Sequence, residues 1–215
     1  MAAALFDLET VQLSSSVTVK RYREMEATSD RNGLTDFIRQ RLSERYIAPL
    51  QAVPRKKKHG FLMVASACLL IETLESFYQG WDRTDQGIPR RDILDACKPA
   101  DSKRSTVSAG EIAFCYFFQR EPAFSSLRPH AHDFYVHVRC GILHQGETTG
   151  GWQIQRKKED ADLFDNPCLN ANRFLAEVEK ALSAYADRLR SAAWDDDIWK
   201  NFRNKMDATI EHCRP

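Results

Sequence analysis

The eighteen-residue stretch Phe61–Tyr78 constrains the fold more than any other part of the chain, because it predicts a helix that is apolar on nearly every side. A surface helix needs only one apolar face, whereas a helix that is apolar all round needs neighbours on every side. We therefore expect Phe61–Tyr78 to lie at the centre of a helical bundle. Its apolar run Phe61–Ile71 spans only 11 residues, fewer than the ~20 that cross a bilayer, so no membrane is expected as a partner.

Two carboxylates, Glu72 and Glu75, interrupt this helix. Being three residues apart, they share one side of it. For Glu72 two interpretations stay open: it faces a neighbouring helix and orients a basic side chain, or it points to solvent. For Glu75 the sequence favours a side chain that points to solvent.

The rest of the chain predicts an all-α, up-and-down bundle of about five or six helices. The polar sequence after residue 145 predicts one small β-hairpin, in which Trp152–Gln155 pairs with Ala161–Phe164. Residues 1–33 are expected to form an N-terminal arm or extension, and residues 34–215 the helical domain. Apolar spacing predicts further helices at Thr35–Leu50, Ala109–Arg120, His130–Gln145, Phe174–Leu189 and after the acidic run Asp195–Asp197.

Capping residues and aromatic content support two of these helices. Ser108 is placed to cap Ala109–Arg120, with Glu111 as its capping-box partner. Asn170 is expected to cap the helix Phe174–Leu189. The four aromatic side chains of Ala109–Arg120 could stack on nucleobases, but buried packing is the commoner fate of such a helix, and we expect it here.

The charge of the chain is nearly balanced, at +1 overall, so composition alone implies no nucleic-acid binding. Residues 120–158 nevertheless carry a net charge of +3 and four of the six histidines. The basic run Arg55–Lys58 is either a phosphate or nuclear-localisation patch or a solvated entry to the following helix, and the second interpretation is favoured.

The cysteines and the N-terminus indicate a cytoplasmic protein. Six cysteines are scattered without a C-x-x-C motif, and Cys68, Cys115 and Cys140 fall in apolar helical patterns, where a free thiol behaves as a small hydrophobe. The first ten residues lack the basic start and the long apolar region of a secretory signal.

Arg139 and His144 follow the aromatic-rich segment Phe134–Val138 and form the most informative pair in the sequence. A fixed cation and a titratable imidazole can bind a phosphate and move a proton beside it. On an α-helix residues five apart project about 140° apart and about 7.5 Å along the axis, so both are expected to be exposed in a cleft that two copies of the chain share. The alternative is structural: Arg139 forms a surface ion pair and His144 caps carbonyls at a helix end.

A neighbouring group of polar side chains could suggest a metal site. His130, His132, Asp133 and His137 offer nitrogen and oxygen ligands at plausible spacing. No partner motif completes the set, so loop and surface histidines are the favoured interpretation.

The segment Phe134–Gln145, "FYVHVRCGILHQ", together with Leu69–Gly80, "LLIETLESFYQG", resembles the HEPN superfamily of small all-α proteins over about Phe61 to Cys213. The resemblance implies a dimeric endoribonuclease that uses no metal or other cofactor, acting as a toxin or effector in phage defence, with an antitoxin or defence protein as a candidate partner. It also implies RNA cleavage through the 2'-hydroxyl to a 2',3'-cyclic phosphate, which DNA cannot undergo.

The resemblance further implies roles for single residues. Arg139 would bind the scissile phosphate, His144 would act as general acid or base, and Glu72 would orient them. Cys140 departs from the polar residue that often follows the arginine in active members, which leaves a non-catalytic module for dimerisation, nucleotide or partner binding as the alternative function. Further residues are expected beside the site in supporting positions, Tyr135 and Cys140, or as RNA contacts, Arg128, His137, Arg156 and Lys157.

Overall fold

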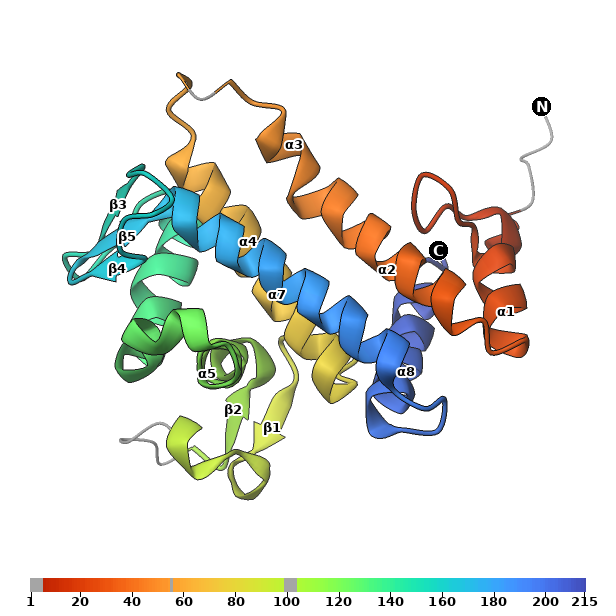
Figure 1. Cartoon of the computed structure of the whole chain (residues 1–215). Coiled ribbons are helices and arrows are strands. Elements are labelled where there is room, and N and C mark those ends of the chain that lie inside the picture. The colour runs from red at the N-terminus through yellow and green to blue at the C-terminus, as the bar shows by residue number, and fades with distance from the viewer. Residues whose placement is uncertain (1–5, 55, 99–103) are drawn as a thin grey trace.

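The computed structural model describes residues 6–54, 56–98 and 104–215. These residues form a mostly helical protein with two small sheets, which confirms the helical class (Figure 1). The α-helices are α1 (Val19–Ala27), α2 (Arg31–Tyr46), α3 (Ala48–Gln51), α4 (Gly60–Gln79), α5 (Ala109–Arg120), α6 (Ala131–Asp133), α7 (Ala171–Ser191) and α8 (Asp197–Glu211).

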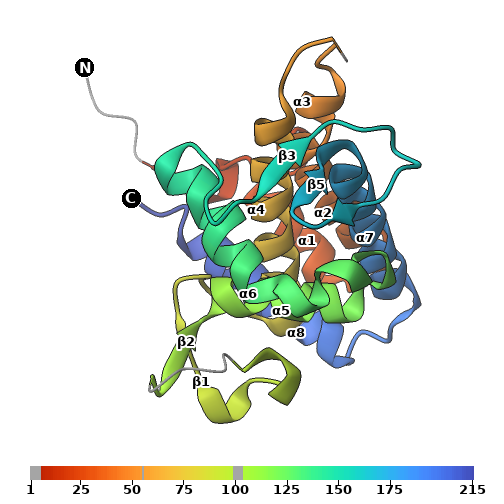
Figure 2. The same ribbon diagram turned by 90° about the vertical axis from the view of Figure 1, so that its left-hand side faces the viewer.

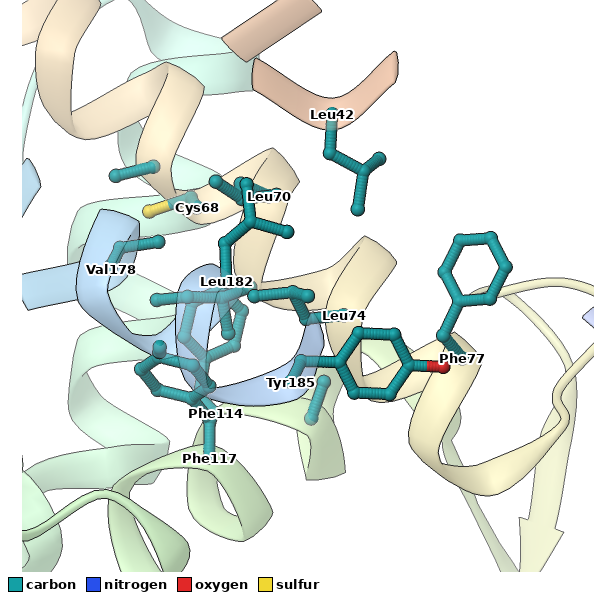
Figure 3. Packing of buried hydrophobic residues seen from close by; sticks show 14 of the residues in the cluster. Leu42, Cys68, Leu70, Leu74, Phe77, Phe114, Phe117, Val178, Leu182 and Tyr185 are labelled. Atoms are coloured by element: carbon teal, nitrogen blue, oxygen red, sulfur yellow. The ribbon is translucent and has the colours of Figure 1, made fainter. Parts of the chain in front are cut away.

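Helix α4 lies at the centre, as its all-round apolar sequence predicts. It packs against α7, α5, α8 and α2, and eleven of its twenty residues are buried (Figure 1). In the core, Leu70 and Leu74 of α4 lie close to Leu182 and Tyr185 of α7, with aromatic rings of α5 beneath them (Figure 3). By length and composition α4 could also span a membrane, but 61% of its most apolar window is buried inside the protein.

The aromatic helix α5 has the bounds that the sequence predicts, and its rings are buried as expected. Phe114, Phe117 and Phe118 are inaccessible to solvent. The Ser108 hydroxyl accepts a hydrogen bond from the backbone N–H of Glu111 at 3.3 Å, which confirms the N-cap. The second hydrogen bond of a capping box, from the backbone N–H of Ser108 to the Glu111 carboxylate, is not formed. That carboxylate instead lies 3.1 Å from Nδ1 of His132.

The segment before α2 contributes to the same hydrophobic core. Leu13, Val17 and Tyr22 are buried, and the Tyr22 ring lies 5.8 Å from that of Phe37 and 6.4 Å from that of Phe202. The division of the chain at residue 33 stays a prediction.

The predicted hairpin after residue 145 is wrong in its strand pairing. Strand β3 (Gln153–Gln155) pairs in parallel with β5 (Cys168–Asn170), and β5 pairs antiparallel with β4 (Phe164–Asp165), so β5 lies between the two expected partners. A three-residue strand carries too little alternation to be recognised in sequence. A second sheet, of β1 (Gly87–Pro89) and β2 (Thr106–Ser108), lies beside α5 (Figure 1).

The predicted α-helix His130–Gln145 is also corrected. The chain forms a 3₁₀-helix, η4 (Pro122–His130), and then the short α6. From there η5 (Phe134–Gln145) continues as a π-helix before the chain turns back to β3 (Figure 2). In a π-helix hydrogen bonds join residues five apart rather than four, so side chains take different directions from those of an α-helix.

One cysteine differs from the expectation of a free thiol. Cys115 of α5 forms a disulfide with Cys97 of the 3₁₀-helix η3 (Asp95–Cys97). Cys68 is a free, buried thiol as expected, and burial raises the pKa of its thiol well above the usual value. Disulfides are more typical of oxidising compartments, so the cytoplasmic location stays a prediction.

Candidate functional site

Arg139 of η5 forms a two-point ion pair with Glu72 of α4. Its Nε lies 2.5 Å from Oε1 of Glu72, and its Nη2 lies 3.0 Å from Oε2. The side chains are 17% and 5% exposed, so Glu72 faces the neighbouring helix, one of its two open interpretations. Burial alone would lower the pKa of the Arg139 guanidinium, but the hydrogen bonds to Glu72 outweigh it and raise that pKa above its usual value.

A second pair on the same helix provides an internal comparison. Glu75 is buried rather than directed to solvent, which corrects the prediction, and it is bound by Nη1 and Nη2 of Arg120 from α5. The remaining Nε of Arg120 donates to Glu121, and Tyr78 covers its guanidinium at 3.7 Å. Every nitrogen of Arg120 therefore has a carboxylate partner within the protein.

One nitrogen of Arg139, Nη1, differs from those of Arg120 in having no carboxylate partner in the described part of the chain. A guanidinium has five N–H groups, and Glu72 takes two of those of Arg139. On the other edge, the one partner of Nη1 among the described residues is the Sγ atom of Cys140 at 3.9 Å, a weak acceptor. The Nη1 group of Arg139 can therefore donate to an anion without losing a carboxylate partner.

The π-helix changes the relation between Arg139 and His144. Because its hydrogen bonds link residues five apart, two such residues follow one another on nearly the same side of η5. The separation of about 140°, which assumed an α-helix, is therefore wrong. His144 is exposed, and no hydrogen bond, ion pair or ring contact joins it to the described part of the chain.

Tyr135 and Cys140 lie beside the guanidinium of Arg139. The Tyr135 ring centre is 5.5 Å from Cζ of Arg139, within the range of a cation–π contact. Both side chains are partly buried, and burial raises the pKa of the Tyr135 hydroxyl. Glu72, Tyr135, Arg139 and Cys140 thus form one cluster, and the exposed His144 lies five residues after Arg139 on the same helix.

The predicted RNA contacts are divided between two places. Arg128 donates from Nε to the Phe118 carbonyl at the end of α5, at 2.8 Å. Nδ1 of His137 lies 2.9 Å from Oγ1 of Thr149. Both side chains have protein partners. Arg156 and Lys157 lie beyond β3, near the first turn of α4, and Arg156 is also bound within the protein.

The group of polar residues around His130 is used in packing. The His130 ring lies 5.3 Å from that of Phe164, and His132 contacts Glu111. Within the described ranges no three His, Cys, Asp or Glu side chains form a group that could hold a metal ion.

Sequence reasoning did not identify two features of this surface. Val136 and Leu143 of η5 are 39% and 38% exposed. In the sequence, apolar residues within an apolar helix do not reveal that they are exposed. The proximity of the basic runs around Lys57 and Lys157 is a tertiary contact between segments 100 residues apart, which no local pattern reveals.

No family model, curated protein or solved structure matches the chain.

Proposed function

We propose that the protein is a metal-independent endoribonuclease of the HEPN type, with Arg139 and His144 as its catalytic residues. One observation carries the proposal: Glu72 fixes Arg139 while the Nη1 edge of its guanidinium has no carboxylate partner among the described residues, and the exposed His144 lies five residues further along η5. A fixed cation beside a free imidazole is the arrangement that cleavage of a phosphodiester requires.

The chemistry follows from these two side chains. The Nη1 edge of Arg139 binds the non-bridging oxygens of the scissile phosphate and stabilises the charge that develops on them. His144 takes the proton from the 2'-hydroxyl or gives one to the departing 5'-oxygen. The 2'-oxygen bonds to phosphorus as the bond to the 5'-oxygen breaks, which yields a 2',3'-cyclic phosphate and a 5'-hydroxyl.

A second function is favoured by a specific observation. Every nitrogen of Arg120 donates to a carboxylate, which demonstrates that an arginine can serve only to neutralise buried carboxylates beside α4. If Arg139 does no more than this, the protein is a non-catalytic HEPN-like module for dimerisation, nucleotide or partner binding. Cys140, where active members of the superfamily often carry a polar residue, supports this alternative.

The proposal extends to partners and location. We infer a homodimer with a cytoplasmic location, and a toxin or effector role in phage defence with an antitoxin or defence protein as partner. The exposed apolar side chains of Val136 and Leu143, beside the proposed site, support a protein interface there.

The test compares two exposed histidines. His144→Ala should abolish cleavage of labelled RNA, whereas His212→Ala, which removes an exposed imidazole from the end of α8, should cleave as the wild type does. Cleavage should persist in EDTA, leave 2',3'-cyclic phosphate ends, and fail when the scissile nucleotide is 2'-deoxy. A wild-type protein that cuts no RNA at any ionic strength would support the non-catalytic module instead.

A further inference from the structure

Two basic segments that are 100 residues apart in sequence line one pocket. Lys56, Lys57 and Lys58 precede α4, and Arg156, Lys157 and Lys158 follow β3. The pocket between them has a volume of about 640 Å³, and none of the described residues that line it is acidic. We call this site the basic pocket. Residues 56–58 are exposed at the entry to α4, as the favoured interpretation expects, and they also line this pocket.

Hydrogen bonds hold the second segment in place. The buried Asn170, at the N-cap position of α7, makes no capping bond and instead accepts from the N–H of Lys157 and donates to the carbonyl of Lys158. Asn172 donates to the carbonyl of Lys157. Backbone groups that are held at three points keep the basic side chains at one place in spite of their mutual repulsion.

Arg156 joins the two segments directly. Its Nη1 donates to the carbonyl of Lys57 at 2.7 Å, and its Nε donates to Oδ1 of Asn172 at 3.0 Å. This bond to the carbonyl of Lys57 holds the backbone of the lysine run before α4 against the segment that follows β3. The protein therefore uses several polar contacts to maintain a concentration of positive charge.

Apolar groups form the rest of the pocket. Phe61, in the first turn of α4, is 38% exposed, and Ile154 of β3 lies beside it. Proteins that bind single-stranded nucleic acid combine a positive groove for the backbone with an aromatic side chain on which a base stacks. An A-form duplex, in contrast, is recognised across a broad surface by its shape.

We propose that the basic pocket binds the backbone of single-stranded RNA, with a base stacked on Phe61. This inference rests on the proposed function, since it supplies a docking site for the same substrate. Residues Phe61, Ala65, Leu69 and Glu72 recur at spacings of four, four and three, so they follow one side of α4 from the pocket to Arg139. Ala65 and Leu69, between the two sites, are both reached by solvent.

The distance along α4 from Phe61 in the pocket to Glu72 beside Arg139 sets a minimum length for the substrate. Eleven residues of α-helix span about 17 Å. At the ~3.4 Å per nucleotide of one strand, about five nucleotides would bridge the pocket and the cleavage site. An oligonucleotide of four nucleotides is too short to occupy both sites, whereas one of twelve is long enough.

The experiment measures binding without cleavage. A fluorescent 12-nucleotide RNA with 2'-O-methyl groups is titrated with the wild type, with Lys56→Ala/Lys58→Ala, and with the control Lys20→Ala/Lys180→Ala, which removes the same charge from exposed positions on α1 and α7. The pocket variant should bind about tenfold more weakly at 50 mM salt, and the slope of log K against log salt should fall by about 1.4, at ~0.7 for each lost phosphate contact. The control should bind like the wild type. A 4-nucleotide RNA, which can occupy only one of the two sites, should bind the wild type more weakly than the 12-nucleotide RNA does.

The outcomes separate this inference from the proposed function. If the wild type cleaves RNA while the pocket variant binds the 12-nucleotide RNA as the control does, the inference is overturned and the nuclease remains. If binding depends on the pocket but the wild type cuts no RNA, the pocket is supported and the nuclease fails. A pocket variant that loses only binding to phosphatidylserine vesicles or to ATP would also overturn the inference.

Discussion

Glu72 and Glu75 lie three residues apart on the most apolar helix of the protein, and each meets an arginine from a different helix. Burying a carboxylate is costly unless a cation and hydrogen bonds compensate it. The sequence could place both acids on one side of α4, but it could not decide whether that side faced protein or solvent. This side of α4 faces protein because η5 and α5 pack against it.

At the scale of single residues, Arg139→Ala should destabilise the protein. Arg139 was expected to be exposed in a cleft, but its side chain is only 17% exposed and pairs with a buried carboxylate. Removing the arginine leaves the buried Glu72 without its cation, which costs about 3 kcal/mol of unfolding free energy. Urea unfolding should give this loss, and Arg120→Ala should cost at least as much because Glu75 is fully buried.

Two controls complete this measurement. Arg139→Met/Glu72→Leu should recover most of the lost stability, because it removes the unpaired charge along with its partner. His144→Ala should change the free energy by no more than about 0.5 kcal/mol, since its side chain is exposed. If Arg139→Ala unfolds at the urea concentration of the wild type, the ion pair does not form in solution. For the same reason, lost activity in His144→Ala is a cleaner sign of catalysis than lost activity in Arg139→Ala.

At the scale of elements, the π-helix η5 is stabilised by the loop that follows it. The loop folds back, so that the N–H of Thr149 donates to the carbonyl of His137 at 3.0 Å. The close approach needs glycine at two points: a Cβ on Gly141 would lie 2.6 Å from the Glu147 carbonyl, and one on Gly150 would lie 2.7 Å from the His137 ring. His137 thus holds the loop against the helix, whatever role it has toward RNA.

Neighbouring glycines allow this contact to be tested. Gly150 and Gly151 both have positive φ, at 59° and 81°, but a Cβ on Gly151 would meet nothing within 4 Å. Alanine at either position costs about 1 kcal/mol for the left-handed backbone. Gly150→Ala should cost about 1–3 kcal/mol more than Gly151→Ala, because it also overpacks the His137 ring. Equal losses in urea unfolding would mean that the loop does not pack on η5.

At the scale of the whole molecule, the homodimer remains a proposal with a changed basis. The argument from a 140° separation no longer applies, because η5 is a π-helix. The argument that remains is the exposed apolar surface of η5, together with the resemblance that implies a two-fold dimer. A symmetric contact of η5 with its copy would cover Leu143, the neighbour of His144 in the sequence, and place two sites beside each other.

The dimer prediction has a matched control. Leu143→Asp should shift the mass measured by light scattering from dimer to monomer at micromolar concentration, because it places a charge in the apolar contact. Leu94→Asp changes a leucine that is 57% exposed in another part of the molecule and should leave the dimer intact. A wild type that is monomeric both alone and with RNA would contradict the proposal.

The sequence by itself determined the positions of α4, α5 and α7 and the central place of α4 in the fold. Helix α5 has the predicted bounds, and α4 and α7 extend the predicted ranges by one to three residues at each end. These features depend on local periodicity and on capping residues, which act within a few residues along the chain. The candidate pair Arg139 and His144 was also visible, because its spacing is local.

The tertiary structure decided how these local elements combine. It alone placed β5 between β3 and β4, wound Phe134–Gln145 as a π-helix, and joined residues 56–58 to residues 156–158. Each of these features depends on contacts between segments distant in sequence, whose energies no local window contains. The same holds for Arg139, whose ion pair with Glu72 spans 67 residues, so its burial and its spare donors follow from packing and not from spacing.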